Sequence, residues 1–127
     1  MKICFLSGAS GTLGKAVMDK LSNDNYVFVT IGRSGQSAKN FIQCDFSKMD
    51  TNKLDRDINS IIDSVNNIEA IDFIHAAGMY KKEGMNIHEN NSILNDTFNV
   101  NTFSFYYIVN TLRSIWERLK VGGSVVA

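Results

Sequence analysis

Ser7-Gly-Ala-Ser-Gly-Thr-Leu-Gly14 is the most informative segment of the chain. It follows directly on the apolar run Ile3-Cys-Phe-Leu6 and leads into a helical pattern. Glycines at this spacing between a strand and a helix suit a turn that cradles a pyrophosphate. Gly8 permits the tight turn, Gly11 lets phosphate oxygens approach the backbone, and Gly14 lets the helix pack against the sheet. The segment predicts a nucleotide-binding turn at a helix N-terminus, with a Gly/Ser surface turn as the alternative.

Outward from this turn, strand patterns alternate with helix patterns. We expect strands over residues 2–7, 26–31, 41–44, 71–75 and 124–127, and helices over about 12–21 and 93–119. A further helix is expected to have Asp50 or Thr51 as its N-terminal cap. Alternating elements with apolar strands predict an α/β fold: a Rossmann-type, doubly wound parallel sheet with helices on both faces.

The composition narrows the class of protein. A chain of 127 residues is expected to form one domain with a real core. Its 13 basic and 13 acidic residues cancel, and neither sign forms a run, which argues against binding to nucleic acid or a membrane surface. Cys4 and Cys44 lack the spacing of a metal site and suit buried free thiols in a reducing compartment. We expect a cytoplasmic protein that binds a small molecule, with no metal and no segment spanning a bilayer.

Arg33 follows the second expected strand, in the loop where dinucleotide-binding folds contact the adenosine ribose. An acidic residue there would bond to a free 2′-hydroxyl, whereas an arginine accommodates a 2′-phosphate. The guanidinium pairs with phosphate oxygens, and Ser34 could add a hydroxyl donor. These residues favour NADP(H) over NAD(H), with an ordinary exposed loop arginine as the alternative.

Three further polar side chains have two interpretations each. Asp45 ends the third expected strand, where it could accept a hydrogen bond from an adenine amino group, or serve as a turn or helix-entry residue. His75, on a buried strand, is expected to be a core histidine with its hydrogen bonds satisfied rather than a ligand. His88 has no second metal ligand at helical spacing and is expected to be an exposed polar residue.

Four motifs in register resemble the short-chain dehydrogenase/reductase family. They are the glycine turn, Cys44-Asp-Phe46, His75-Ala-Ala-Gly78 and Asn99-Val-Asn101. The third resembles the family's Asn-Asn-Ala-Gly element, which stabilises the sheet and touches the cofactor ribose, and His75 is a departure from it. Asn101 matches the helix asparagine that, in the family, belongs to a catalytic tetrad and organises a proton-relay water. The resemblance runs in order through essentially the whole chain. Its glycine spacing is more like that of the extended and atypical branches, whereas the stretch before Asn101 and Gly122-Gly-Ser-Val-Val126 look more classical, so the branch stays open.

The resemblance implies an NADP(H)-dependent oxidoreductase acting on a carbonyl or alcohol. Asn101 is the expected catalytic residue. A non-catalytic NADP(H)-binding sensor or scaffold is the alternative, and an extended-branch epimerase or dehydratase is a second one. The residues expected at the cofactor are Ser7, Gly8, Ser10, Gly11, Thr12, Leu13, Gly14, Arg33, Ser34, Asp45, Phe46, Ala76, Ala77 and Gly78.

The family's chemistry also needs a serine just after the fifth strand and a Tyr-x-x-x-Lys motif on the next helix. Ser124 lies within the expected fifth strand, slightly early for that serine. No tyrosine of this chain is followed by lysine four residues on; the tyrosines are Tyr26, Tyr80, Tyr106 and Tyr107. We therefore expect a cofactor-binding half of a reductase, truncated after the fifth strand and inactive alone.

The long expected helix has an apolar stripe and additional aromatic residues beside it. The stripe, expected to face the sheet, comprises Asn101, Phe105, Ile108, Leu112, Ile115 and Leu119. Phe103, Tyr106 and Tyr107 fall off this stripe and predict an apolar outer surface, through which family members commonly pair. We expect a homo-oligomer formed through this helix. Val125 and Val126 are expected to lie on an edge strand open to further pairing.

Overall fold

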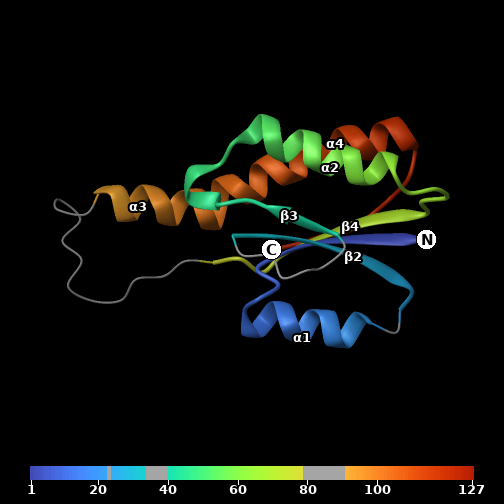
Figure 1. Ribbon diagram of the computed structural model, residues 1–127, viewed down its shortest axis with the longest axis horizontal. Helices are drawn as coiled ribbons and strands as arrows, with labels where there is room; N and C mark the ends of the chain where they lie inside the picture. Colours follow the sequence, from blue (N-terminus) through green and yellow to red (C-terminus); the bar gives the residue numbers. More distant parts are fainter. Residues whose placement is uncertain (23, 34–39, 79–90) are drawn as a thin grey trace.

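The computed structural model of the protein describes residues 1–22, 24–33, 40–78 and 91–127. Five parallel strands form one sheet in the order β3-β2-β1-β4-β5 (Figure 1). Chain order runs outward from β1 to β3 on one side and from β4 to β5 on the other, so the topological switch lies between β1 and β4. The doubly wound parallel sheet predicted from the sequence is confirmed. Its strands are β1 (Lys2–Ser7), β2 (Tyr26–Gly32), β3 (Phe41–Gln43), β4 (Ala70–His75) and β5 (Val125–Val126).

Helices cover both faces of the sheet, as predicted. Figure 1 shows α1 on one face and α2 with α4 on the other. Asp50 caps α2, its carboxylate accepting a hydrogen bond from the backbone N–H of Lys53 at 3.0 Å, as one of the two sequence alternatives predicted. The helical elements are α1 (Thr12–Leu21), the 3₁₀ turn η1 (Phe46–Lys48), α2 (Thr51–Asp63), α3 (Asn91–Phe98), the π-helical turn η2 (Asn99–Phe103) and α4 (Ser104–Leu119).

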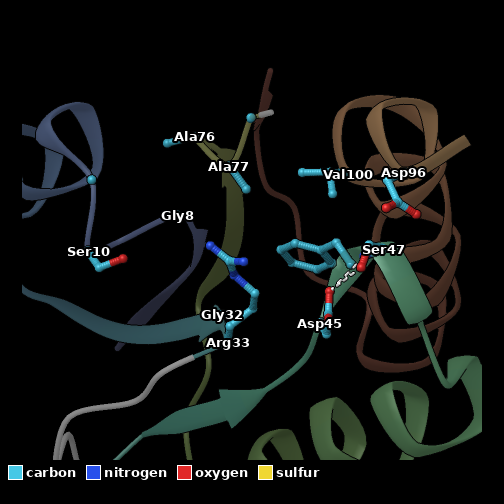
Figure 2. Close-up of a pocket in the computed structure, with 13 residues that line it drawn as sticks. Gly8, Ser10, Gly32, Arg33, Asp45, Ser47, Ala76, Ala77, Asp96 and Val100 are labelled. Atoms are coloured by element: carbon cyan, nitrogen blue, oxygen red, sulfur yellow. Dashed lines mark hydrogen bonds between the residues drawn. The ribbon is translucent and has the colours of Figure 1, made fainter. Parts of the chain in front are cut away.

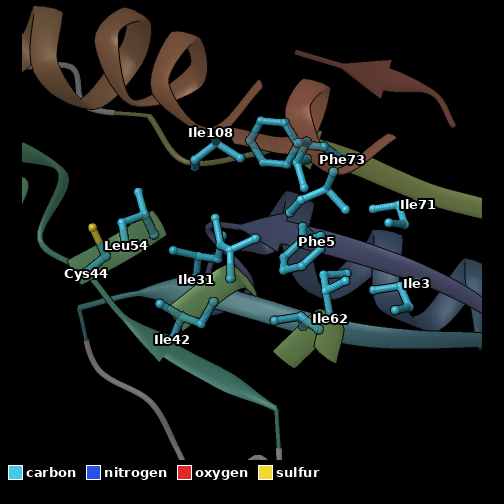
Figure 3. Close-up of a cluster of buried hydrophobic side chains, with 14 of the residues drawn as sticks. Ile3, Phe5, Ile31, Ile42, Cys44, Leu54, Ile62, Ile71, Phe73 and Ile108 are labelled. Carbon is cyan, nitrogen blue, oxygen red and sulfur yellow. The ribbon is translucent and has the colours of Figure 1, made fainter. Parts of the chain in front are cut away.

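The main core lies between the sheet and the face of α2 and α4 (Figure 3). Successive side chains of a strand point to opposite faces, so Ile3 and Phe5 of β1 enter this core together with Ile71 and Phe73 of β4. The helices contribute the buried side chains of Leu54, Ile58, Ile62, Ile108, Leu112 and Ile115.

The expected helix over residues 93–119 is interrupted by a π-helical turn, and this corrects one part of the predicted stripe. Ile108, Leu112 and Ile115 are buried as expected, but Asn101 is exposed and Ser104 is fully buried in its place. A π-helical turn closes i→i+5 hydrogen bonds and therefore holds an extra residue, which rotates the preceding residues about the helix axis. The predicted stripe, whose members are alternately four and three residues apart, assumed an uninterrupted α-helix.

Several smaller expectations can be compared with the described residues. Cys4 and Cys44 are free and buried, as predicted, and burial raises the pKa of Cys4 to about 12 and that of Cys44 to about 11. β5 is an edge strand with exposed Val125 and Val126. None of the described helices is long and apolar enough to cross a membrane. Ser34 and His88 lie outside the described residues.

Candidate functional site

A cavity of about 550 Å³ opens at the carboxyl ends of the parallel strands, beside the switch between β1 and β4 (Figure 2). Ligands of open α/β sheets bind at this position, because the loops that leave two neighbouring strands run in opposite directions there and leave a crevice. The cavity is lined by Gly8, Ser10, Gly11, Gly32, Arg33, Asp45, Phe46, Ser47, Ala76, Ala77, Gly78, Asp96 and Val100.

The glycine turn packs backbone against backbone. Gly8 has a φ of 73°, and a Cβ added there would lie 2.6 Å from the backbone nitrogen of Ala77. A Cβ at Gly14 would lie 2.1 Å from the carbonyl oxygen of Gly8. Both positions therefore exclude a side chain, the first because of the turn out of β1 and the second because of the close approach of α1. These are the two structural roles expected for Gly8 and Gly14.

The N-terminus of α1 is suited to an anion. Its N-cap is Gly11, which has no side chain to satisfy the first N–H groups, and no acidic residue lies in the first turn. The positive end of the helix dipole therefore faces the turn without a carboxylate to neutralise it. Thr12 and Leu13 are exposed and Gly14 is buried, and these residues form the turn and helix start without lining the cavity.

Arg33 extends from the end of β2 into the cavity. Figure 2 places its side chain between Gly8 on one side and Asp45 on the other. Arg33 is exposed, and its charge helps to lower the pKa of Asp45. A guanidinium in this position can pair with a phosphate that enters beside the glycine turn.

Asp45 is a turn residue, which is one of the two roles that the sequence predicted for it. Its Oδ1 accepts hydrogen bonds from the backbone N–H of Ser47 at 3.0 Å and from the Ser47 hydroxyl at 2.7 Å, which caps η1. The hydrogen bonds from Ser47 hold the pKa of Asp45 below its usual value, and Arg33 and Lys48 act in the same direction. Because both bonds use Oδ1, the cap is compatible with a further contact of Oδ2 in the cavity.

His75 has hydrogen bonds at both ring nitrogens, as predicted, but it is half-buried and not part of the buried apolar core. Its Nδ1 lies 2.7 Å from Oγ of the fully buried Ser7, and its Nε2 lies 3.2 Å from the carbonyl oxygen of Val100. Ser7 Oγ also accepts a hydrogen bond from the backbone N–H of Ala77 at 3.2 Å. Ser7 therefore supports the wall of the cavity from behind and does not line it.

Asn101 lies in the π-helical turn at the edge of the site. Its Oδ1 would be 3.8 Å from a Cβ placed on Gly78, which does line the cavity. Asn101 itself is exposed and is not among the lining residues. The structure therefore places it next to the cavity and not in its wall.

Four lining residues were missed by the sequence reasoning. Gly32 and Ser47 each adjoin a residue that was expected at the site, Arg33 and Phe46. Asp96 and Val100 come from α3 and η2, four residues apart, a spacing that places two side chains on one helix face. This four-residue spacing could have indicated that Asp96 and Val100 share a helix face. The local sequence does not indicate whether that face lies toward the sheet.

The charges of the cavity are divided between two walls. The N-terminus of α1 and Arg33 are positive, and Asp45 and Asp96 are acidic. Phe46 and Val100 add apolar surface beside the acidic side chains. Such a cavity suits an extended ligand with an anionic group at one end and a flat group with hydrogen-bond donors at the other. In the described part of the chain, no three His, Cys, Asp or Glu side chains gather as a metal site would require.

The sheet order and the cavity at the switch point are those of a Rossmann-type fold, and comparison with known proteins narrows this class. No protein-family model and no curated protein matches the chain. Among solved structures, a short-chain dehydrogenase/reductase family oxidoreductase from Brucella ovis, in complex with a partially ordered NAD, matches with a TM-score of 0.78 at 24% identity. That match covers 98% of this chain and 60% of the other.

Two further structures match equally well in shape. ElxO with NADP bound has a TM-score of 0.78 at 17% identity, and 4-hydroxyisoleucine dehydrogenase complexed with NADH has a TM-score of 0.78 at 16% identity. Each match covers 98% of this chain and 54% of the other. The chain thus has the fold of the N-terminal part of short-chain dehydrogenase/reductase enzymes and spans only a little over half the length of these structures.

Proposed function

We propose that the chain is the cofactor-binding half of a short-chain dehydrogenase/reductase and binds an NAD(P) dinucleotide in the cavity at the switch point. The observation that carries this proposal is the glycine turn. The N-terminus of α1 can lie at the edge of the cavity only because Gly8 and Gly14 have no Cβ to collide with the backbone. The uncapped N–H groups would bind the pyrophosphate. The structural match to family members with NAD, NADP or NADH supports the same ligand class.

We propose NADP(H) as the preferred form. Among the described residues, Arg33 is the cationic side chain that lines the cavity, and it follows the end of β2, where this class of fold contacts the adenosine ribose. The matched structures hold either form, so the proposal rests on Arg33.

For the reaction, a bound NADP(H) would exchange a hydride with a carbonyl or alcohol. The residues of this chain would bind and orient the cofactor, and Asn101 is proposed as the catalytic group that this half contributes. Because the sequence holds no Tyr-x-x-x-Lys, we propose that this chain alone does not complete proton transfer. The alternative, a nucleotide-responsive module without chemistry, would use the same cavity.

The test of the binding step is calorimetric titration of the chain with NADP⁺, NAD⁺ and, as a control, adenosine. We expect saturable binding of one nucleotide per chain, with NADP⁺ the tightest. Absence of saturable binding for both dinucleotides would contradict the proposed function. Turnover of NADPH with a panel of carbonyls, measured on the chain and on any longer product of the same gene, separates the enzyme from the module without chemistry.

A further inference from the structure

One hydrogen-bond chain in the structure connects two walls of the cavity. It runs from the backbone N–H of Ala77 to Ser7 Oγ at 3.2 Å, from Ser7 Oγ to His75 Nδ1 at 2.7 Å, and from His75 Nε2 to the Val100 carbonyl at 3.2 Å. Ser7 immediately precedes Gly8 of the glycine turn, and Val100 precedes Asn101 in the π-helical turn. His75 is thus in contact with both segments.

The partners determine the tautomer of His75. Ser7 Oγ already accepts the Ala77 N–H, so its own hydrogen is available for His75 Nδ1. A carbonyl oxygen can only accept, so His75 Nε2 must carry a hydrogen to bond with Val100. In the neutral ring, which burial favours by lowering the pKa of His75, the hydrogen therefore lies on Nε2 and every bond in the chain runs in one direction.

The π-helical turn explains why the Val100 carbonyl is available to His75. In an α-helix this carbonyl would accept the backbone N–H of Ser104. Here the Ser104 N–H bonds to the carbonyl of Asn99 instead. The Val100 carbonyl receives the Ser104 hydroxyl at 2.6 Å and the His75 ring. Two side chains thus replace a backbone bond that the π-helical turn gives up.

Three aromatic rings fix the orientation of the His75 ring. The centroids of Phe46, Phe73 and Phe105 lie 6.1, 5.8 and 5.7 Å from that of His75. Phe46 also lines the cavity. Packing on several sides leaves the ring little freedom to rotate, so its two nitrogens stay directed at Ser7 and Val100.

We propose that His75 is a positioning residue that couples the glycine turn to the π-helical turn bearing Asn101. Through Ser7 it braces the segment that would bind the pyrophosphate, and through Val100 it holds the turn that presents Asn101 beside Gly78. The role of this coupling in nucleotide binding rests on the function proposed above. The coupling itself does not depend on a ligand.

The coupling can be tested without ligand by nuclear magnetic resonance of the backbone amides. S7A removes the hydroxyl at one end of the hydrogen-bond chain, and we expect it to shift the amide signals of residues 100–104 at the other end. In the H75F background, where the ring cannot transmit the change, S7A should leave those signals in place. Equal shifts in both backgrounds, or no shift in either, would overturn the proposal.

If H75F does not fold, two other variants of His75 can be used, each of which keeps one of its two hydrogen bonds. An asparagine amide reaches about as far as Nδ1 and can keep the Ser7 contact, whereas a glutamine amide reaches about as far as Nε2 and can keep the Val100 contact. Neither H75N nor H75Q can bond at both ends, so S7A should not shift residues 100–104 in either variant. A shift as large as that in wild type would overturn the coupling.

Binding of NADP⁺ tests the functional consequence. We expect H75Q, which leaves the Ser7 hydroxyl without its acceptor, to bind NADP⁺ up to about tenfold more weakly, and H75N to bind within about threefold of wild type. Equal affinities of H75Q and wild type would show that His75 does not position the nucleotide site. If wild type itself fails to bind NADP⁺, the proposed function is wrong, whereas the amide-shift experiment still decides the coupling.

Discussion

At the scale of single residues, Arg33 carries the proposed cofactor preference. Its guanidinium stands in the cavity wall at the end of β2, exposed and without a carboxylate to pair with it among the described residues. A hydrogen bond between charged groups contributes about 1.5–3 kcal/mol, more than a neutral one. One side chain is therefore enough to separate two cofactors that differ by one phosphate.

Arg33→Asp should accordingly reverse the preference. We expect NADP⁺ to bind at least about tenfold more weakly, because the cation is replaced by an anion, and NAD⁺ to bind as well as before or better. Arg56→Asp makes the same charge change at an exposed position of α2 and should leave both affinities unaltered. Competition calorimetry gives both values, and an unchanged ratio in Arg33→Asp would remove Arg33 from the site.

The fold requires a residue without a side chain at Gly8. Gly8→Ala places a Cβ 2.6 Å from the Ala77 nitrogen at a φ of 73°, so we expect a loss of more than about 1 kcal/mol in the free energy of unfolding. Gly32→Ala is the control, because a Cβ at Gly32 meets nothing within 4 Å. Urea denaturation measures both, and equal stability of the two variants would contradict the close backbone packing.

His75 predicts a dependence of stability on pH. Burial lowers its pKa below the ordinary 6.5, and the bonds to the Val100 and Asn101 carbonyls oppose this only in part. The unfolded chain therefore binds the proton more readily than the folded one. The stability that comes from keeping this ring neutral is present above pH 6.5 and is lost as the pH falls from 6.5 through the lowered pKa.

The measurement compares urea midpoints at about pH 7.5 and about pH 5.5. We expect the loss of stability on acidification to be smaller in His75→Gln than in wild type. His88→Gln removes the other histidine of the chain and should keep the wild-type dependence. Equal pH dependence in wild type and His75→Gln would show that the ring does not change protonation between the folded and unfolded states.

At the scale of elements, the sequence predicted the strands and helices well and the interior of one helix poorly. Lys2–Ser7 and Thr12–Leu21 have the predicted ends. The other strands differ from prediction by one residue at one end, or at both ends for β5. The periods of apolar residues encode these elements directly. The π-helical turn was missed because one extra residue in a turn changes the register of Asn101 and Ser104 without disturbing the pattern on either side.

The site elements show the same division. Some residues of the cavity wall were predicted because they follow the end of a strand with a recognisable pattern. Examples are Gly8 and Ser10 after β1, and Ala76 and Ala77 after β4. Asp96 was missed because its place depends on how α3 and η2 pack against η1, where the Asn99 amide donates to the Ser47 carbonyl at 3.3 Å. No local pattern encodes that contact.

At the scale of the whole molecule, the apolar surface is uneven. Phe103, Tyr106 and Tyr107 are 48%, 62% and 42% exposed on the outside of η2 and α4, and Phe98 precedes them with its ring centroid 6.4 Å from that of Phe103. Aromatic side chains that gather on one outer face are typical of a protein interface. We propose that copies of the chain form a homo-oligomer through this face.

Tyr106→Glu should therefore weaken association, since it places a carboxylate in an apolar contact. We expect light scattering to give the mass of more than one chain for wild type and of a single chain for the variant. Lys20→Glu, on the exposed side of α1 across the sheet, should leave the mass unaltered. A single-chain mass for wild type at every concentration would contradict the proposal.

The sequence by itself determined the alternation of elements, the doubly wound sheet and the glycine turn at its switch point. Each of these follows from the local periods of apolar residues and from the backbone freedom of glycine at single positions. Only the tertiary structure decided that Asp45 uses Oδ1 to cap η1, that His75 joins Ser7 to Val100, and that Asp96 and Val100 complete the cavity. The His75 contacts and the completed cavity join residues far apart in the chain, and packing, which no single segment encodes, brings them together. The Asp45 cap is local, but the sequence left the use of that carboxylate open between two interpretations.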